Sequence, residues 1–282
     1  MSFVIDPKLA DQSRDTTPDD QMNESSHLWY FQQCSDNREL LKSVEVVIPV
    51  RPEDGMSCDL ARMVSIWYGE GTAWSQLNDN CGGFIEMTRA NIAYDFVHRK
   101  RPVEPKYLLM IDNDMVPPIN LPYMLAHHGL PVVGGVAVSM HDKGPRACFT
   151  AMCKDGEYRF PEMRKHILPS KGLIKAGHVG TGALLIRRDV LESFSFEGSD
   201  IPFYVPESIR QTGARVGRLI MGEDLIFSEQ CREKGFEVYV DAEARLGHLK
   251  RLKMEWVKEK TSDTLVAENF IMEPYKGVPV RK

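Results

Sequence analysis

The sequence predicts a layered α/β domain with a central, mostly parallel sheet flanked by helices. Short apolar runs typical of buried strands alternate with segments of helical periodicity in the first half of the chain. Acidic or glycine-rich residues follow several of these runs. Because ligands of such sheets bind where the carboxyl ends of the strands meet, these residues are the first candidates for a functional site.

Three apolar runs predict buried strands, at 44–50, 106–114 and 131–138. Between the first two, residues 84–99 predict a helix, because apolar residues recur there at helical spacing. Further helices are expected at 59–67, at 121–129 and from Gly222 to Gly235.

The second half of the chain adds strands and a tail. Residues 148–160 predict a hairpin with Asp155-Gly156 as its turn, 183–186 a strand that leads into a helix, and 236–241 another strand. We expect a single globular domain over 44–250. It is preceded by a polar extension over 1–43, partly disordered or packed on the surface, and followed by a charged tail over 251–282 with a helix at 253–268.

Composition excludes few partners. The chain has 282 residues and a net charge of −5, so no strong overall field attracts nucleic acid or anionic membranes, although a local basic patch would suffice. Its six cysteines form no C-x-x-C pair, which favours reduced, buried thiols over a zinc site. The start lacks the pattern of a signal peptide and no apolar run is long enough to span a bilayer, so we expect a cytoplasmic protein without membrane insertion.

The run Asp112-Asn113-Asp114 stands at the end of the second strand. For both carboxylates to reach one ion, the chain must turn at Asn113, and asparagine is a residue that turns tolerate well. Two carboxylates brought together there make an oxygen-rich site for Mg²⁺ or Mn²⁺, completed by water and diphosphate oxygens. A plain turn with a capping and a solvated aspartate is the alternative.

Four further candidates lie elsewhere in the chain. Glu223 and Asp224 open a helix and could act on an acceptor hydroxyl or merely complement the helix dipole. His248 could complete a metal site or be structural. Gly180-Thr181-Gly182 could let a ligand approach the backbone or form a tight turn. Arg89 falls on the buried side of its helix, where it needs an anionic partner, either a diphosphate or a protein carboxylate.

In series, these motifs resemble the family-2-like glycosyltransferases of GT-A fold, in the short soluble form often encoded by bacteriophages and bacteria. The resemblance covers residues 44–249. It implies a nucleotide-diphosphate-sugar donor, most often a UDP-sugar, and Mn²⁺ or Mg²⁺. Under it, the metal ligands are Asp112, Asp114 and His248, and the acids near the acceptor are Asp224, as base, and Glu223. The donor-binding residues are Pro49, Val50, Arg51, Arg89, Asp112, Asn113, Gly180, Thr181 and Gly182.

The acceptor is the least determined part of this hypothesis. A hydroxymethylated base in phage DNA, a protein or a glycan would each offer a hydroxyl. Basic clusters at 99–101, 187–188 and 250–260 could follow a phosphate backbone, or could be solvated helix ends. A sugar nucleotidyltransferase and a non-catalytic nucleotide- or carbohydrate-binding module remain alternatives. The chain lacks the G-x-G-T-R type of first loop that the nucleotidyltransferase would need.

Overall fold

The computed structural model describes residues 37–50, 56–78, 84–141, 144–153, 155, 157–162, 168–206 and 222–249, together with three short strands near the C-terminus. The chain divides into two compact units, Met1–His248 and Leu249–Lys282. The first unit holds the sheet, its helices and the motifs singled out above.

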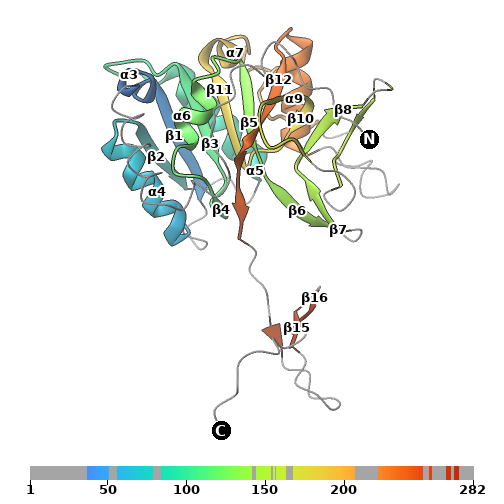
Figure 1. Ribbon diagram of the computed structural model, residues 1–282. Helices are drawn as coiled ribbons and strands as arrows, with labels where there is room; N and C mark the ends of the chain where they lie inside the picture. The colour runs from blue at the N-terminus through green and yellow to red at the C-terminus, as the bar shows by residue number, and fades with distance from the viewer. Residues whose placement is uncertain are drawn as a thin grey trace. The chain divides into compact units, whose positions relative to one another are not determined.

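The core of the first unit is a nine-stranded sheet (Figure 1). Its strands lie in the order β2-β1-β3-β11-β5-β12-β10-β8-β9. In that order they are Ala73–Asn78, Val44–Val50, Tyr107–Ile111, Ala183–Arg187, Val132–Val136, Val238–Arg245, Leu173–Val179, Phe149–Met152 and Tyr158–Arg159.

The sheet is mixed, so the prediction of a mostly parallel sheet is wrong. Only β2–β1, β1–β3 and β5–β12 pair in parallel; the other neighbours are antiparallel. β11 begins beside Ile111, where β3 ends, and therefore runs against β3. β8 and β9 form the hairpin predicted for 148–160. The short link between β8 and β9 leaves no room for the helical crossover that joins parallel neighbours.

Helices cover both faces of the sheet. On one face α3 (Arg38–Lys42), α4 (Cys58–Gly69) and α6 (Leu121–Ala126) pack against Tyr107, Leu109 and Ile111. On the other, α5 (Ile85–His98), α7 (Arg188–Glu192) and α9 (Glu223–Glu233) pack against Leu108 and Met110. Alternate residues of β3 thus enter opposite core layers, as the two-residue period of a strand requires, and the whole strand is buried.

Two small antiparallel ribbons complete the first unit. β4 (Met115–Val116), just after the acidic turn, pairs with β13 (Gly247–His248). β6 (Val138–His141) pairs with β7 (Gly144–Ala147). The first ribbon brings His248, the last residue of the unit, next to Met115.

The C-terminal unit contains β14 (Met254–Glu255), β15 (Leu265–Ala267) and β16 (Phe270–Met272), paired antiparallel. The helix predicted over 253–268 is therefore wrong for its described residues. The sequence explains the difference: two apolar triplets separated by two residues follow a hairpin pattern that the charged flanks obscured. Within the described residues of the whole chain, no helix has the length and apolar character needed to cross a bilayer.

Candidate functional site

The acidic turn lies at the carboxyl end of β3. The amide of Met115 donates to the carbonyl of Asp112 at 3.1 Å and closes a turn around Asn113, as expected from the sequence. The amide of Asp112 donates to the carbonyl of Gly182 at 3.2 Å, so the glycine segment that precedes β11 lies against this turn. Two of the predicted motifs are therefore in direct contact.

Arg89 links the acidic turn to the start of α9. Its Nη2 donates to Asp112 Oδ1 at 2.6 Å and its Nη1 donates to Glu223 Oε1. The arginine side chain is only 5% exposed, and the carboxylates of Asp112 and Glu223 are 27% and 17% exposed. The helical spacing correctly placed Arg89 on a buried face, and the anionic partners that the structure shows are protein carboxylates.

His248 faces the second aspartate of the turn. Its Nε2 lies 2.9 Å from Asp114 Oδ2, and its Nδ1 lies 2.9 Å from the carbonyl oxygen of Val138. Because a carbonyl can only accept, Nδ1 carries a hydrogen. The Nε2 contact with a carboxylate is then favourable only when a proton or a metal cation lies at Nε2. This arrangement is the one by which proteins orient a histidine for a metal.

Asp224 is the second residue of α9, and its carboxylate is largely buried. Its Oδ1 accepts from the amide of Leu225 at 2.8 Å. Burial raises the pKa of this carboxyl above its usual value, against the lowering effects of the Leu225 amide and the Arg89 charge. A raised pKa makes a carboxylate a stronger proton acceptor once it is ionised, which is the property that a general base needs.

The glycines of the 180–182 segment permit its close packing between the two acidic groups. A Cβ on Gly180 would lie 2.9 Å from the carbonyl oxygen of Cys148, and one on Gly182 would lie 3.1 Å from the Cβ of Ala137. The same point on Gly180 is 3.5 Å from Asp224 Oδ2. The segment therefore touches the acidic turn at one end and Asp224 at the other, while Thr181 is buried between.

The donor-binding role expected for Pro49, Val50 and Arg51 stays a prediction. Pro49 and Val50 are buried in β1, at the edge where β3 also ends, and Arg51 lies outside the described residues. Within the described part of the chain, no group of three or more histidine, cysteine, aspartate or glutamate side chains is arranged to hold a metal ion. Asp114 and His248 are brought together, whereas Asp112 is paired with Arg89.

Polar contacts join α9 to β10, and one of their residues, Ser228, was not predicted from the sequence. Ser228 Oγ accepts from the amide of Val179 at 3.1 Å and donates to the carbonyl of Asp224 at 2.9 Å. Next to it, His178 lies between Thr150 Oγ1, at 2.9 Å, and Glu229 Oε1, at 3.3 Å, and burial lowers the pKa of its imidazole. Ser228 stands four residues after Asp224, a helical spacing that could have revealed it.

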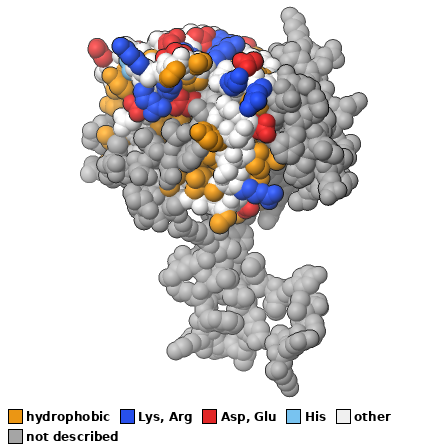
Figure 2. Space-filling view, turned by 90° about the vertical axis from the view of Figure 1, so that its left-hand side faces the viewer, with side chains coloured by type: hydrophobic (Ala, Val, Ile, Leu, Met, Phe, Trp, Pro, Cys, Tyr) orange, Lys and Arg blue, Asp and Glu red, His pale blue; other side chains and the backbone are white. Residues whose placement is uncertain are grey.

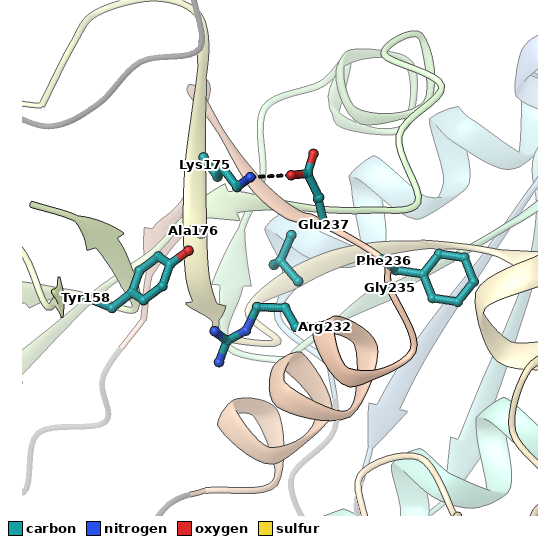
Figure 3. A pocket seen from close by; sticks show the side chains of 8 residues that line it. Tyr158, Lys175, Ala176, Arg232, Gly235, Phe236 and Glu237 are labelled. Atoms are coloured by element: carbon teal, nitrogen blue, oxygen red, sulfur yellow. Dashed lines mark hydrogen bonds and ion pairs between the residues drawn. The ribbon is translucent and has the colours of Figure 1, made fainter. Parts of the chain in front are cut away.

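A pocket of about 220 Å³ lies beyond the other end of α9 (Figure 3). Arg232 and Tyr158 border it, and Lys175 there is ion-paired with Glu237. None of the residues predicted for the site lines this pocket. Arg232, which lines the pocket, is on α9 eight residues after Asp224, about 12 Å away along the helix axis.

Two of the three basic clusters, at 187–188 and 99–101, lie at the opposite end of the sheet from the candidate site. Arg187 pairs with Tyr107, at the opposite end of β3 from Asp112, about 17 Å away along the strand. Arg187 is ion-paired with Asp189, Arg188 with Glu104, and Arg101 with Glu45. On the side where α4 lies, the described basic and acidic side chains are intermixed (Figure 2). The residues of the 250–260 cluster other than 254–255 lie outside the described part.

Comparisons with known proteins add only a distant structural likeness. No protein-family model and no curated protein sequence matches the chain. Among solved structures, a crystal structure of GalNAc-T7 with UDP, GalNAc and Mn²⁺ aligns with a TM-score of 0.44 and 11% sequence identity. The alignment covers 74% of this chain but 43% of that one, so this chain spans less than half the length of the protein it matches. A likeness at this level does not bear on function.

Proposed function

We propose that the protein is a metal-dependent glycosyltransferase that moves a sugar from a nucleotide-diphosphate-sugar to an acceptor hydroxyl. One observation carries the proposal: four carboxylates from two distant parts of the chain converge on the carboxyl edge of the sheet, around Gly180–Gly182. The carboxylates are those of Asp112, Asp114, Glu223 and Asp224. Ligand sites of α/β sheets form at this edge.

Charge balance supports a divalent cation at this edge. Arg89 pairs with two of these carboxylates, Asp112 and Glu223, and the largely buried carboxylate of Asp224 adds a third beside the same arginine. Asp114 and His248 would hold Mn²⁺ or Mg²⁺, with Asp112 as a further ligand through the oxygen that Arg89 does not use. The histidine is already oriented for this by Val138. When bound, the cation would neutralise charge on the diphosphate leaving group.

The donor would bind beside the acidic turn. The 180–182 segment is tightly packed and has little side chain, so a ligand there can approach the backbone closely. Pro49, Val50 and Arg51 would lie near the nucleotide base, and Asn113 near the diphosphate, as the family resemblance implies. A UDP-sugar is the first donor to test.

Asp224 would accept the proton of the acceptor hydroxyl. The acceptor oxygen forms the new bond to the anomeric carbon, the bond from that carbon to the phosphate oxygen breaks, and the nucleoside diphosphate leaves with the electron pair. Glu223, held by Arg89, would orient the acceptor. If the anomeric configuration is retained, both acids would position the acceptor without removing its proton.

The acceptor is proposed only as a class. A hydroxyl on a glycan or a protein suits the site as well as a hydroxymethylated DNA base does. Among the described basic residues, Arg187 and Arg188 lie about 17 Å from Asp112 along the sheet and are ion-paired. A sugar nucleotidyltransferase and a non-catalytic binding module remain the alternatives.

Thermal-shift measurements with a panel of nucleotide sugars, with and without Mn²⁺, test the proposal. We expect one nucleoside diphosphate to raise the melting temperature only when Mn²⁺ is present. Asp114→Ala should abolish this shift, whereas Asp95→Ala, at an exposed position on α5, should preserve it. Absence of stabilisation by every nucleoside diphosphate would refute donor binding. Binding without sugar transfer to DNA, protein or glycan acceptors would favour the non-catalytic module.

A further inference from the structure

We infer that Arg89 is a positioning residue that couples the donor side of the site to its acceptor side, rather than a ligand of the donor diphosphate. The inference rests on the proposed function. Arg89 contacts Asp112, which belongs to the donor side, and Glu223, which belongs to the acceptor side. The three residues come from α5, the turn after β3 and the start of α9.

The hydrogen bonds of Arg89 leave little for a phosphate. Nη2 donates to Asp112 and Nη1 donates to Glu223. Nε is buried and has no hydrogen-bond partner among the described residues, so neither solvent nor a ligand reaches it. Each Nη has a second hydrogen, but the arginine side chain is only 5% exposed, so a diphosphate could reach this guanidinium only if a group that covers it moved away.

The same contacts make the two acids interdependent. A planar guanidinium fixes the directions of its N–H groups, so the position of Asp112 and that of Glu223 are set by one rigid group. A change in the position of either carboxylate therefore changes the position of the other. Lysine keeps the charge but presents a single ammonium group, and it cannot reproduce this geometry.

Four variants of the full chain test the coupling: Arg89→Lys, Arg89→Met, Glu223→Gln and the double variant Arg89→Met/Glu223→Gln. The first measurement is the melting temperature without ligand. Arg89→Met should lower it by about 5 °C or more, because two carboxylates lose their partner. Adding Glu223→Gln should recover part of this loss. Arg62→Met, at an exposed position on α4, is the matched control and should have no effect.

The second measurement is the Mn²⁺-dependent affinity for UDP, together with kcat and both KM values. If the coupling exists, Glu223→Gln alone weakens UDP binding about threefold or more, although Glu223 belongs to the acceptor side. Arg89→Lys should then lower kcat and change both KM values. A merely structural role for Arg89 would lower the melting temperature without moving UDP affinity in Glu223→Gln.

Three results would overturn the inference. One is a melting temperature that Glu223→Gln does not recover. Another is UDP affinity that falls more than tenfold in Arg89→Lys but is unchanged in Glu223→Gln, which would assign Arg89 to the diphosphate. Both leave the proposed function intact if the unaltered protein binds UDP with Mn²⁺. Absence of binding of any nucleoside diphosphate to the unaltered protein would overturn the proposed function and the coupling together.

Discussion

The two edges of the sheet each contain a buried carboxylate–arginine cluster, and their charges are balanced differently. At the amino end of β1, Glu45 is 5% exposed in its side chain and pairs with Arg101 at 2.6 Å and with Arg99 at 3.6 Å. At the carboxyl end of β3, a single arginine, Arg89, serves both Asp112 and Glu223.

The amino-edge cluster is complete within the chain. Arg101 also donates to the carbonyls of Phe96 and Arg99, so its guanidinium joins α5, the loop after it and β1. Two arginines on one carboxylate leave no negative charge to be balanced. We interpret this cluster as structural.

The carboxyl-edge cluster has an excess of negative charge. Asp224 adds a third carboxylate beside the pair that Arg89 serves, and burial raises its pKa. Burial of acids without enough cations lowers stability and is maintained where function requires it. We therefore interpret the amino-edge cluster as a structural ion pair and the carboxyl-edge cluster as a site that can bind a cationic ligand.

Asp224→Asn should have the largest effect on activity. Loss of a general base lowers kcat by about 10²–10⁴-fold, and the variant should still bind UDP with Mn²⁺. Steady-state kinetics and calorimetry on the same preparation measure the two properties. Unchanged kcat would exclude Asp224 as the base and would favour a site that acts with retention of configuration.

Arg101→Met should have the largest effect on stability. It leaves Glu45 buried without its closest cation, which costs about 3–5 kcal/mol in the free energy of unfolding. Denaturant unfolding gives this value, and nucleotide binding by the folded protein should not change. If Arg101→Met weakened Mn²⁺-dependent UDP binding in the folded protein, the separation between structural and functional edges would be wrong.

The sequence predicted the carboxyl edge better than the amino edge, and locality explains why. Asp112 and Asp114 follow a run of buried residues, and Arg89 falls on the apolar face of its helix. Residues close to them in the sequence are therefore enough to predict where they lie. Glu45 stands inside an apolar strand, and its partner Arg101 is 56 residues away. No local pattern distinguishes that arginine from its neighbours Arg99 and Lys100.

The order of the strands in the sheet could not be predicted from the sequence either. The apolar run at 183–186 predicts a buried strand but carries no signal for its insertion between β3 and β5. That position depends on pairing with residues about 50 and 75 positions earlier in the chain. The mixed sheet follows from this insertion, and so does the contact between Asp112 and Gly182.

Removal of the metal should affect only the carboxyl edge. Mn²⁺ at 100 times its dissociation constant would stabilise the protein by about 2.7 kcal/mol, because the unfolded chain lacks the site. Asp114→Ala should lose this stabilisation, and Glu45→Gln should keep it. Calorimetric melting with added Mn²⁺, before and after a chelator, measures it. Equal stabilisation of Asp114→Ala and the unaltered protein would place the ion elsewhere.

The smallest effect concerns the pH dependence of stability, which should have opposite signs at the two edges. The pKa of Asp224 is raised by burial, so this carboxyl favours the folded state at low pH and loses that contribution as pH rises through its folded pKa. Asp224→Asn should therefore raise the melting temperature at neutral pH, and the gain should shrink on acidification.

Asp189 provides the matched change at the amino edge. A hydrogen bond from Arg187 lowers the pKa of this carboxyl, so its contribution to stability is present at neutral pH and is lost as pH falls through its folded pKa. Asp189→Asn should lower the melting temperature slightly at neutral pH, since the pair is half-exposed, and the difference should vanish in acid. Melting curves of both variants between pH 3 and pH 8 compare the two edges directly. This range includes the ordinary pKa of an aspartate, about 3.9. If both variants changed the melting temperature in the same direction at neutral pH, burial would not disfavour the ionised form of Asp224. The carboxyl edge would then not hold the excess of negative charge that we assign to it.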